Sequence, residues 1–234
     1  SDPDSGNIVT RPFFNAEDNV NDRELVSQPG VIAGTVSVDS GNEFSGGGVA
    51  VQRCVWRCCD PCGCGPSSQV YMLGGYRHYR YDSDLVITED LEIIDSGGFV
   101  PGTTILLQDR FFTENEFHGG EVGLQGMLQR SCWWVDGLFK VAVGSHRRVV
   151  TIDGDTTFDI PVNGTSQVDT FAGGLLTSEV TNIGRYADNT IAVIPELRVG
   201  VGAQLTCNIS MRAGYGVIFW NAVAQAGSQL PPGL

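Results

Sequence analysis

Four stretches of this chain alternate between apolar and polar residues, and no other feature restricts its fold as strongly. The alternating stretches are 116–129, 132–147, 191–205 and 208–221. Within 191–205, for example, Leu197 and Val199 alternate with Glu196 and Arg198. Successive side chains of a β-strand point to opposite faces, so each stretch predicts a strand with one apolar and one polar face.

Four further stretches alternate less cleanly, and no stretch has the apolar spacing of an amphipathic helix. These weaker stretches are 30–39, 44–58, 69–82 and 168–178. The chain also contains 31 glycines, which weaken helices and favour strands and turns. Together the stretches predict an all-β fold of about eight antiparallel strands.

The connections between these stretches predict the domain organisation. The connections at 130–131 and 206–207 are tight, whereas we expect long loops at 83–115 and 148–167. Antiparallel strands joined in this way are typical of an up-and-down sheet that closes into a barrel, because closure removes exposed edges. We therefore expect an extended N-terminal segment at 1–30, a β-barrel at 31–222 and a C-terminal tail at 223–234.

Alternation alone leaves open which face meets water. In a soluble sandwich or lipocalin-like barrel the apolar face forms the core, whereas in a membrane barrel it faces lipid and the lumen is polar. Three features favour the membrane barrel. The polar faces mix glycine with charges of both signs, the stretches are long enough for the roughly 9–11 residues of a tilted crossing strand, and aromatic residues stand near their ends. These aromatic residues are Tyr79, Tyr81, Trp133, Trp134, Phe219 and Trp220.

The charge balance narrows the classes of partner. The formal net charge is −13, which argues against a nucleic-acid-binding surface because such surfaces need clustered positive charge. The sequence has no window of about 18 apolar residues and therefore predicts no membrane-spanning helix. It starts at Ser1 without a Met, which favours a processed product or a fragment.

Six segments, taken in order, resemble a known family. They are 74–85 (GGYRHYRYDSDL), 109–124 (DRFFTENEFHGGEVGL), 141–154 (VAVGSHRRVVTIDG), 171–176 (FAGGLL), 193–202 (VIPELRVGVG) and 214–223 (GYGVIFWNAV). Together, over residues 11–230, they resemble the planctomycete family of predicted outer-membrane β-barrel porins. Any one of these motifs is weak, but the six in one order are fairly specific.

The resemblance implies an antiparallel up-and-down transmembrane barrel in the outer membrane, in contact with its lipid. It also implies porin-like passive diffusion of small polar solutes. The family has further aromatic-rich strands ahead of the matching region, so the chain resembles the C-terminal two-thirds or so and is expected to be part of a larger barrel. The alternative is a structural or self-assembling cell-surface barrel without transport activity, which contacts copies of itself or other envelope proteins.

Charged residues stand on the predicted polar faces. They are Arg77, Glu121, Asp136, Lys140, Glu196, Arg198 and Arg212. Enclosed charges must be paired because losing their hydration is costly, so we expect a lumen-facing network. That network is either a constriction that selects solutes by charge or part of a filled interior, as in barrels of about eight strands.

The seven cysteines predict disulfide bonds rather than a metal cluster. They are Cys54, Cys58, Cys59, Cys62, Cys64, Cys132 and Cys207. Thiolates at short spacing can hold zinc or an iron–sulfur cluster, but these spacings match no standard finger. Because exported proteins fold in an oxidising compartment, we expect a disulfide-stapled turn or a bridge to a partner chain, and neither a metal nor another cofactor.

The acidic segment with Asp153, Asp155 and Asp159 offers oxygen ligands of the kind that calcium prefers. It lacks the length of a helix–loop–helix calcium site. We therefore expect an acidic turn there rather than a metal site.

Three histidines, His78, His118 and His146, are far apart in the sequence but can meet on neighbouring strands. With nearby carboxylates they could form a metal or catalytic site. No nucleophile motif accompanies them, so the sequence predicts that the protein is not an enzyme.

Overall fold

The structure, a computed structural model, describes residues 8–15, 20–58, 67–95, 98–162 and 164–230. Its strands are β1 (Val9–Asn15), β2 (Val20–Ser27), β3 (Ile32–Cys58), β4 (Ser67–Ile93), β5 (Thr104–Arg130), β6 (Trp133–Val162), β7 (Thr165–Ala172), β8 (Gly184–Thr206) and β9 (Ile209–Ile218). In this part of the chain the only helical element is the 3-10 helix η1 (Ala226–Gln229). None of the described residues belongs to a helix that is long and apolar enough to span a membrane.

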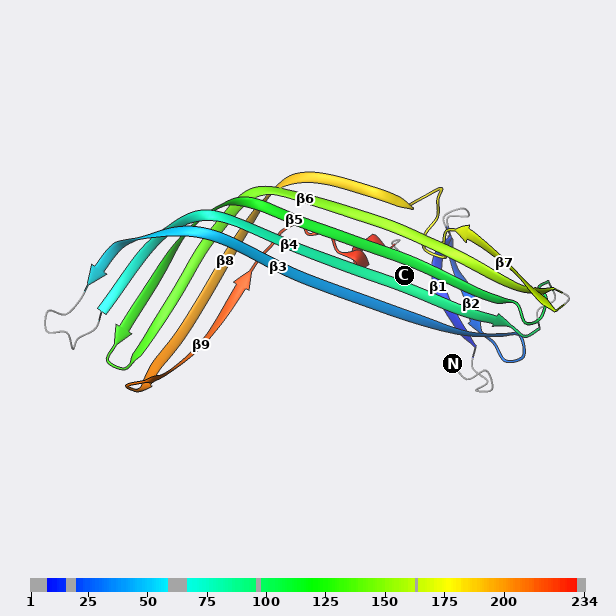
Figure 1. Cartoon of the computed structure of the whole chain (residues 1–234), viewed down its shortest axis with the longest axis horizontal. Coiled ribbons are helices and arrows are strands. Elements are labelled where there is room, and N and C mark those ends of the chain that lie inside the picture. Colours follow the sequence, from blue (N-terminus) through cyan, green and yellow to red (C-terminus); the bar gives the residue numbers. More distant parts are fainter. Residues whose placement is uncertain (1–7, 16–19, 59–66, 96–97, 163, 231–234) are drawn as a thin grey trace.

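The main sheet is antiparallel and follows the order β3-β4-β5-β6-β8-β9, with β7 paired to the far end of β6. Figure 1 shows these strands running side by side and bending about halfway along. The predicted tight turns are present, since Arg130 pairs with Trp133 and Thr206 with Ile209. The all-β antiparallel prediction is therefore confirmed. The described sheet leaves β3 and β9 as its edges, so closure into a barrel of about eight strands stays a prediction.

The strands are much longer than the alternating stretches of the sequence. β4 and β5 contain 27 residues each, and β6 contains 30. The long loops expected at 83–115 and 148–167 are therefore wrong, because most of both segments is strand. The weaker stretches 30–39 and 44–58 form one strand, β3. Backbone pairing continues through these segments, but both faces carry polar side chains there, such as buried Glu89 and exposed Asp90, and the alternation is hidden.

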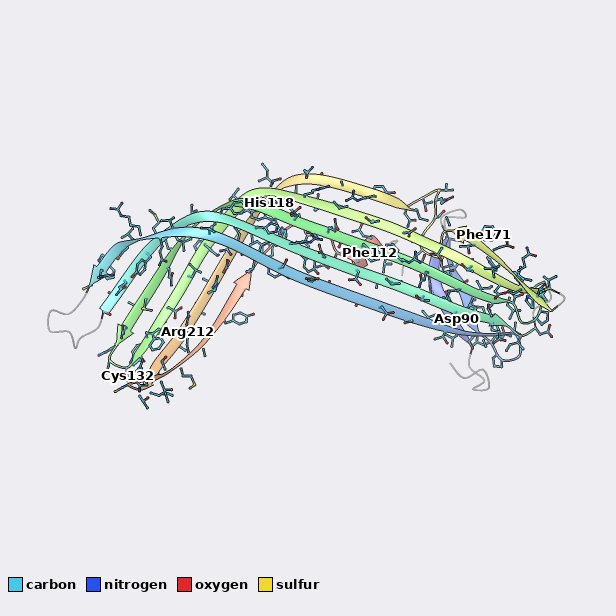
Figure 2. All side chains as sticks on the ribbon, in the orientation of Figure 1. Asp90, Phe112, His118, Cys132, Phe171 and Arg212 are labelled. Carbon is cyan, nitrogen blue, oxygen red and sulfur yellow. The ribbon has the colours of Figure 1, made fainter. Side chains whose placement is uncertain are left out.

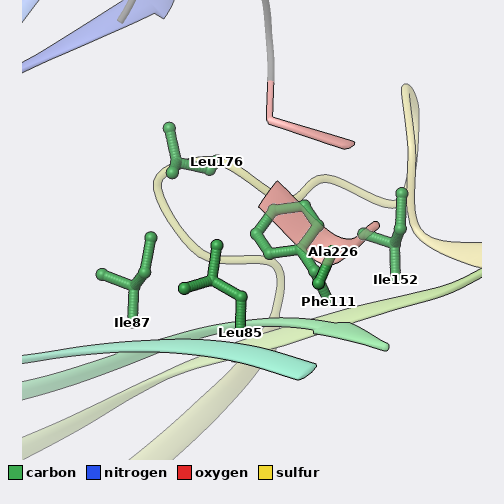
Figure 3. Close-up of a cluster of buried hydrophobic side chains, with 6 residues drawn as sticks. All are labelled: Leu85, Ile87, Phe111, Ile152, Leu176 and Ala226. Carbon is green, nitrogen blue, oxygen red and sulfur yellow. The ribbon is translucent and has the colours of Figure 1, made fainter. Parts of the chain in front are cut away.

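The central strands β4, β5, β6 and β8 bury one face of the sheet, which we call the inner face, and we call the opposite one the outer face. Odd-numbered residues of β4 and β5 and even-numbered residues of β6, β8 and β9 point inward. Figure 3 shows one buried apolar cluster of the inner face, formed by Leu85, Ile87, Phe111, Ile152, Leu176 and Ala226. A second cluster contains Tyr79, Phe117, Ala142, Ala192 and Ile194, with Trp220 packed against it.

The C-terminal segment packs against this inner face. The side-chain amide of Asn115 donates to the carbonyl of Ala224 at 2.8 Å, and its oxygen accepts from the amide of Ala224 at 2.7 Å. Ala226 of η1 joins the first cluster, and its amide donates to the hydroxyl of Ser83. Residues 223–230 of the C-terminal tail expected at 223–234 thus lie against the inner face, where Asn115 pairs with both backbone groups of Ala224.

The N-terminal region, expected as an extended segment, instead contains the two-stranded sheet β1-β2. Arg11 of β1 connects this hairpin to the inner face of the main sheet. Its guanidinium donates to Glu89 of β4 at 3.0 Å and to Asp109 of β5 at 3.1 Å. Both carboxylates are fully buried, and Glu24 of β2 lies beside Glu89. One cation therefore holds the hairpin against a group of carboxyl groups.

This arrangement makes the docking of the hairpin depend on pH. Burial raises the pKa of Glu89 from its ordinary 4.5 to about 7; the neighbouring Glu24 also raises it, and Arg11 opposes the shift. The pKa of Glu89 is higher in the folded protein than in the unfolded chain. The stabilisation of the docked hairpin by protonated Glu89 is therefore complete below the unfolded pKa and is lost as the pH rises through the folded pKa. We expect amide hydrogen exchange in β1 and β2, corrected for intrinsic rates, to be slower near pH 5 than near pH 8.

The matched variant is Glu89→Gln, which keeps the side chain neutral at both pH values. It should remove most of the difference in exchange. Equal protection of the wild-type hairpin at both pH values would contradict the assignment.

Candidate functional site

The outer face carries a continuous apolar surface in the arm of the sheet that ends at the tight turns. This surface, which we call the apolar band, extends from these turns to a row of paired residues on β4, β5, β6 and β8. The row consists of Tyr76, Gly120, Val143 and Val193. Exposed side chains of the band include Val49, Val51, Met72, Val122, Leu124, Phe139, Val143, Val193, Leu197, Val199, Val201, Tyr215 and Val217. Soluble monomeric proteins rarely expose a contiguous apolar surface of this extent.

The height of the band fits a bilayer. β6 crosses the band between Trp133 and Val143, a span close to the roughly 9–11 residues that a tilted strand needs. Trp133 and Tyr76 are partly exposed at its two ends, where interfacial aromatic residues belong. Beyond the band the outer face becomes charged, with Arg80, Glu114, Glu116 and Arg147. The interfacial positions expected for Tyr79 and Trp220 are wrong, because both pack on the inner face.

On the inner face behind the band, five charged side chains form one network. The Nζ atom of Lys140 lies 3.1 Å from Glu121 of β5 and 2.9 Å from Glu196 of β8. Arg77 of β4 donates to Glu121 in two hydrogen bonds of 2.8 and 3.0 Å. Arg198 donates to Glu196 at 2.5 Å. The side chains of Lys140, Glu121 and Glu196 are almost completely buried. Three cations and two carboxylates thus pair with one another, with Lys140, Glu121 and Glu196 buried at the centre and Arg198 partly exposed at the edge.

The remaining two charged residues form a pair of their own. Arg212 of β9 donates to Asp136 of β6 at 2.5 Å. The hydroxyl of Tyr79 adds to the larger network by donating to Glu196 at 3.1 Å. The structure therefore brings all seven charged residues that the sequence singled out to the inner face, each in an ion pair. Their description as lumen residues stays a prediction, because the described sheet is not closed.

Glycine on the inner face provides the room that these long side chains occupy. A Cβ atom at Gly123 would lie 2.5 Å from the Cβ of Lys140, and one at Gly200 would lie 2.9 Å from Oδ1 of Asp136. Larger residues at either position would displace the ion pairs, since the interior is closely packed. The glycine-rich polar face of the sequence is therefore a packing requirement of the network.

Aromatic side chains fill the inner face next to the network. The ring of Tyr79 lies 5.5 Å from that of Phe44, 6.3 Å from Phe117 and 6.1 Å from Trp220. Trp220 also lies 5.1 Å from the ring of His146. Sequence reasoning missed this layer, because Phe44 and Trp220 come from opposite edges of the sheet. The only signal in the sequence was that Tyr79 and Trp220 stand near the ends of alternating stretches.

The cysteine prediction is not supported where the structure describes the thiols. Cys54, Cys58, Cys132 and Cys207 are free and exposed. Cys59, Cys62 and Cys64 lie outside the described residues. Cys132 and Cys207 lie in the two tight turns beyond the end of the apolar band, where solvent replaces a packing partner.

The acidic segment that was expected to form a turn is part of strand β6. Asp153 and Asp155 lie on β6 rather than in a turn, and both bind Arg110 of β5, at 3.2 and 2.6 Å. The third acidic residue of that segment, Asp159, also lies on β6 and accepts a hydrogen bond from Ser166 of β7.

Two of the histidines, His78 and His118, face each other on the outer face of β4 and β5, with ring centroids 4.5 Å apart. The third, His146, is buried on the inner face.

The network makes a testable distinction between two of its cations. Replacing Lys140 with Met leaves two carboxylates enclosed without their central partner, and breaking a buried pair in this way costs about 3–5 kcal/mol. The side chain of Arg198 is 56% exposed, so Arg198→Met should cost less than about 1 kcal/mol. Urea unfolding of lipid-reconstituted protein, followed by tryptophan fluorescence, measures both. An equal loss in the two variants would show that Lys140 is not enclosed.

Comparison with known proteins places these features in a family. No curated protein matches the chain. The model of one protein family, described as Putative beta barrel porin-7 (BBP7), matches residues 1–233. The match covers almost the whole chain and agrees with a porin-like resemblance of the six sequence segments. The chain belongs to the Putative beta barrel porin-7 (BBP7) family.

Proposed function

We propose that this chain forms part of the wall of a β-barrel in the outer membrane, with the apolar band in lipid and the inner face toward the lumen. The observation that carries the proposal is the inverted exposure of neighbours on β8. Leu197 and Val199 are 51% and 52% exposed, whereas Glu196 is 3% exposed. A soluble barrel would bury the apolar residues and hydrate the carboxylate. Membership in a porin family supports the same orientation.

The barrel closes beyond the described sheet. A groove of about 420 Å³ is lined by Phe44 and Tyr81 from one edge region and by Ile218 and Trp220 from the other, so the sheet curls around its inner face. Backbone groups of an edge strand cannot stay unpaired in lipid, and β3 and β9 therefore need partners there. Additional strands satisfy this need and fit the larger barrel that the sequence resemblance implies. The planctomycete origin is likewise an expectation of that resemblance.

Passive diffusion of small polar solutes is the activity that we assign to this barrel. The network around Lys140 supplies fixed charges at the depth of the apolar band, and such charges select solutes by sign. The C-terminal segment narrows the path by packing Trp220 against Tyr79 and Phe117. Solutes therefore pass the charged network and then the aromatic layer.

The second candidate is a structural barrel without transport. It is favoured by the same aromatic layer, because side chains that fill the interior leave no open path. The two candidates share the membrane wall and differ only in conductance.

The membrane orientation is tested by a charge placed in the band. Val199→Arg puts a cation on the lipid side near the middle of the band, which costs roughly 2–4 kcal/mol and should reduce insertion into lipid vesicles. Ala187→Arg is the matched control, because Ala187 is an exposed outer-face residue of the same strand beyond the band. Insertion is read from heat-modifiable electrophoretic mobility. Normal insertion of Val199→Arg would refute the lipid assignment.

Transport is tested by ion conductance in planar bilayers. Trp220→Ala removes the central contact of the aromatic layer and should increase single-channel conductance. Phe219→Ala is the control, because Phe219 is 62% exposed and lies outside the layer, so conductance should equal that of wild type. Protein that inserts but conducts in neither wild type nor Trp220→Ala would overturn transport and leave the structural barrel.

A further inference from the structure

His78 and His118 form a cross-strand pair on the outer face, one row beyond the apolar band. They are paired residues of β4 and β5, and Figure 2 places His118 at the bend of the sheet. Glu116 precedes His118 by two residues on the same face, and its Oε1 lies 3.1 Å from Nε2 of His118. One ligand atom from each of the three residues lies within 4.8 Å of the other two.

Neighbouring groups orient both imidazole rings. Nδ1 of His78 lies 3.1 Å from the carbonyl oxygen of Phe117, so this nitrogen carries the proton and Nε2 keeps its lone pair. Nδ1 of His118 hydrogen bonds with the hydroxyl of Tyr76 at 2.5 Å. In metal sites the ring nitrogen that does not bind the metal is held in this way by a backbone carbonyl or a polar group. Nε2 of His78 thus keeps its lone pair for coordination, and Nε2 of His118 faces the carboxylate of Glu116.

The surroundings leave the three side chains accessible and Glu116 available. Gly47 pairs with His78 from β3 and Ser145 pairs with His118 from β6, so neither flank carries a bulky side chain. Two cations face Glu116 from the neighbouring strands, Arg80 on β4 and Arg147 on β6. The Nε atom of Arg80 donates instead to Asp82 at 2.7 Å, and among the described residues Arg147 forms no ion pair with Glu116. The carboxylate of Glu116 therefore keeps its contact with His118.

We propose that His78, His118 and Glu116 bind a divalent transition metal ion such as Zn²⁺, with coordination positions open toward solvent. Two imidazole nitrogens and one carboxylate oxygen are a donor set that Zn²⁺ uses together with water. Tetrahedral ligands at the usual Zn²⁺ distances stand about 3.4 Å apart. The distance of 3.1 Å between Glu116 and His118 is close to this spacing, and His78 offers a ligand atom within 4.8 Å of both. The ion ties β4 to β5 where the strands leave the apolar band, and this inference is independent of transport.

The test uses the full chain in detergent micelles with its thiols alkylated, because free cysteines also bind these metals. Co²⁺ serves as the probe. We expect visible absorption of a four- or five-coordinate Co²⁺ site without the near-ultraviolet bands of thiolate ligation, and loss of this absorption when Zn²⁺ is added. His78→Gln and His118→Gln should each weaken Co²⁺ binding about tenfold or more, a loss already seen when only an outer partner of a ligand is removed.

Glu114→Gln is the matched control, since Glu114 is an acidic residue of the same face two positions from Glu116. It should leave binding unchanged, whereas Glu116→Gln should weaken it. A mutation-free measurement guards against misfolded variants: Zn²⁺ should protect His78 and His118 from diethyl pyrocarbonate, as read by mass spectrometry. Binding that survives both histidine substitutions, equal loss in Glu114→Gln, or no protection by Zn²⁺ would each overturn the site.

Discussion

Lys140 lies almost completely buried between Glu121 and Glu196 on the inner face, and the rest of the structure depends on this pairing. An enclosed charge without a partner costs several kcal/mol, so the inner face can be enclosed only if its charges find one another. The register achieves this, because Lys140 pairs with Glu196 directly across β6 and β8 while Glu121 lies diagonally opposite on β5. A slip of one residue would exchange the two faces of a strand, so the register is as constrained here as in a hydrophobic core.

The same pairing permits the opposite surface to be apolar. With the charges satisfied inside, the outer face carries valine, leucine and aromatic side chains over a height that fits a bilayer. Beyond the end of the band that lies away from the tight turns, the long strands continue with polar residues on both faces. The sheet therefore has one arm suited to lipid and one arm suited to water, and the histidine pair stands at the boundary between them.

The interior combines features of a constriction and of a filled barrel. Glycines beside Lys140 and Asp136 give the charged side chains their room, and the C-terminal segment brings Trp220 over Tyr79. In the water-facing arm, Arg11 attaches the N-terminal hairpin to carboxylates of β4 and β5. Two segments that flank the main sheet in the sequence thus cover its inner face. The N-terminal hairpin does so through the ion pairs of Arg11, and the C-terminal segment through polar contacts with Asn115 and Ser83 and through the apolar contacts of Ala226 and Trp220.

The sequence by itself determined the strand class, the two faces of the later strands and the position of seven charged residues on the polar face. It did so because side-chain direction has a period of two, and that period survives wherever one face is apolar. Only the tertiary structure decided the rest. Residues 83–93 and 104–115 continue as strands because neighbouring backbones pair, although polar residues on both faces erase the alternation. The strand register brings His78 next to His118, and the path of the C-terminal segment brings Trp220 to Tyr79 and Phe44. The local sequence pattern predicts neither the register nor that path.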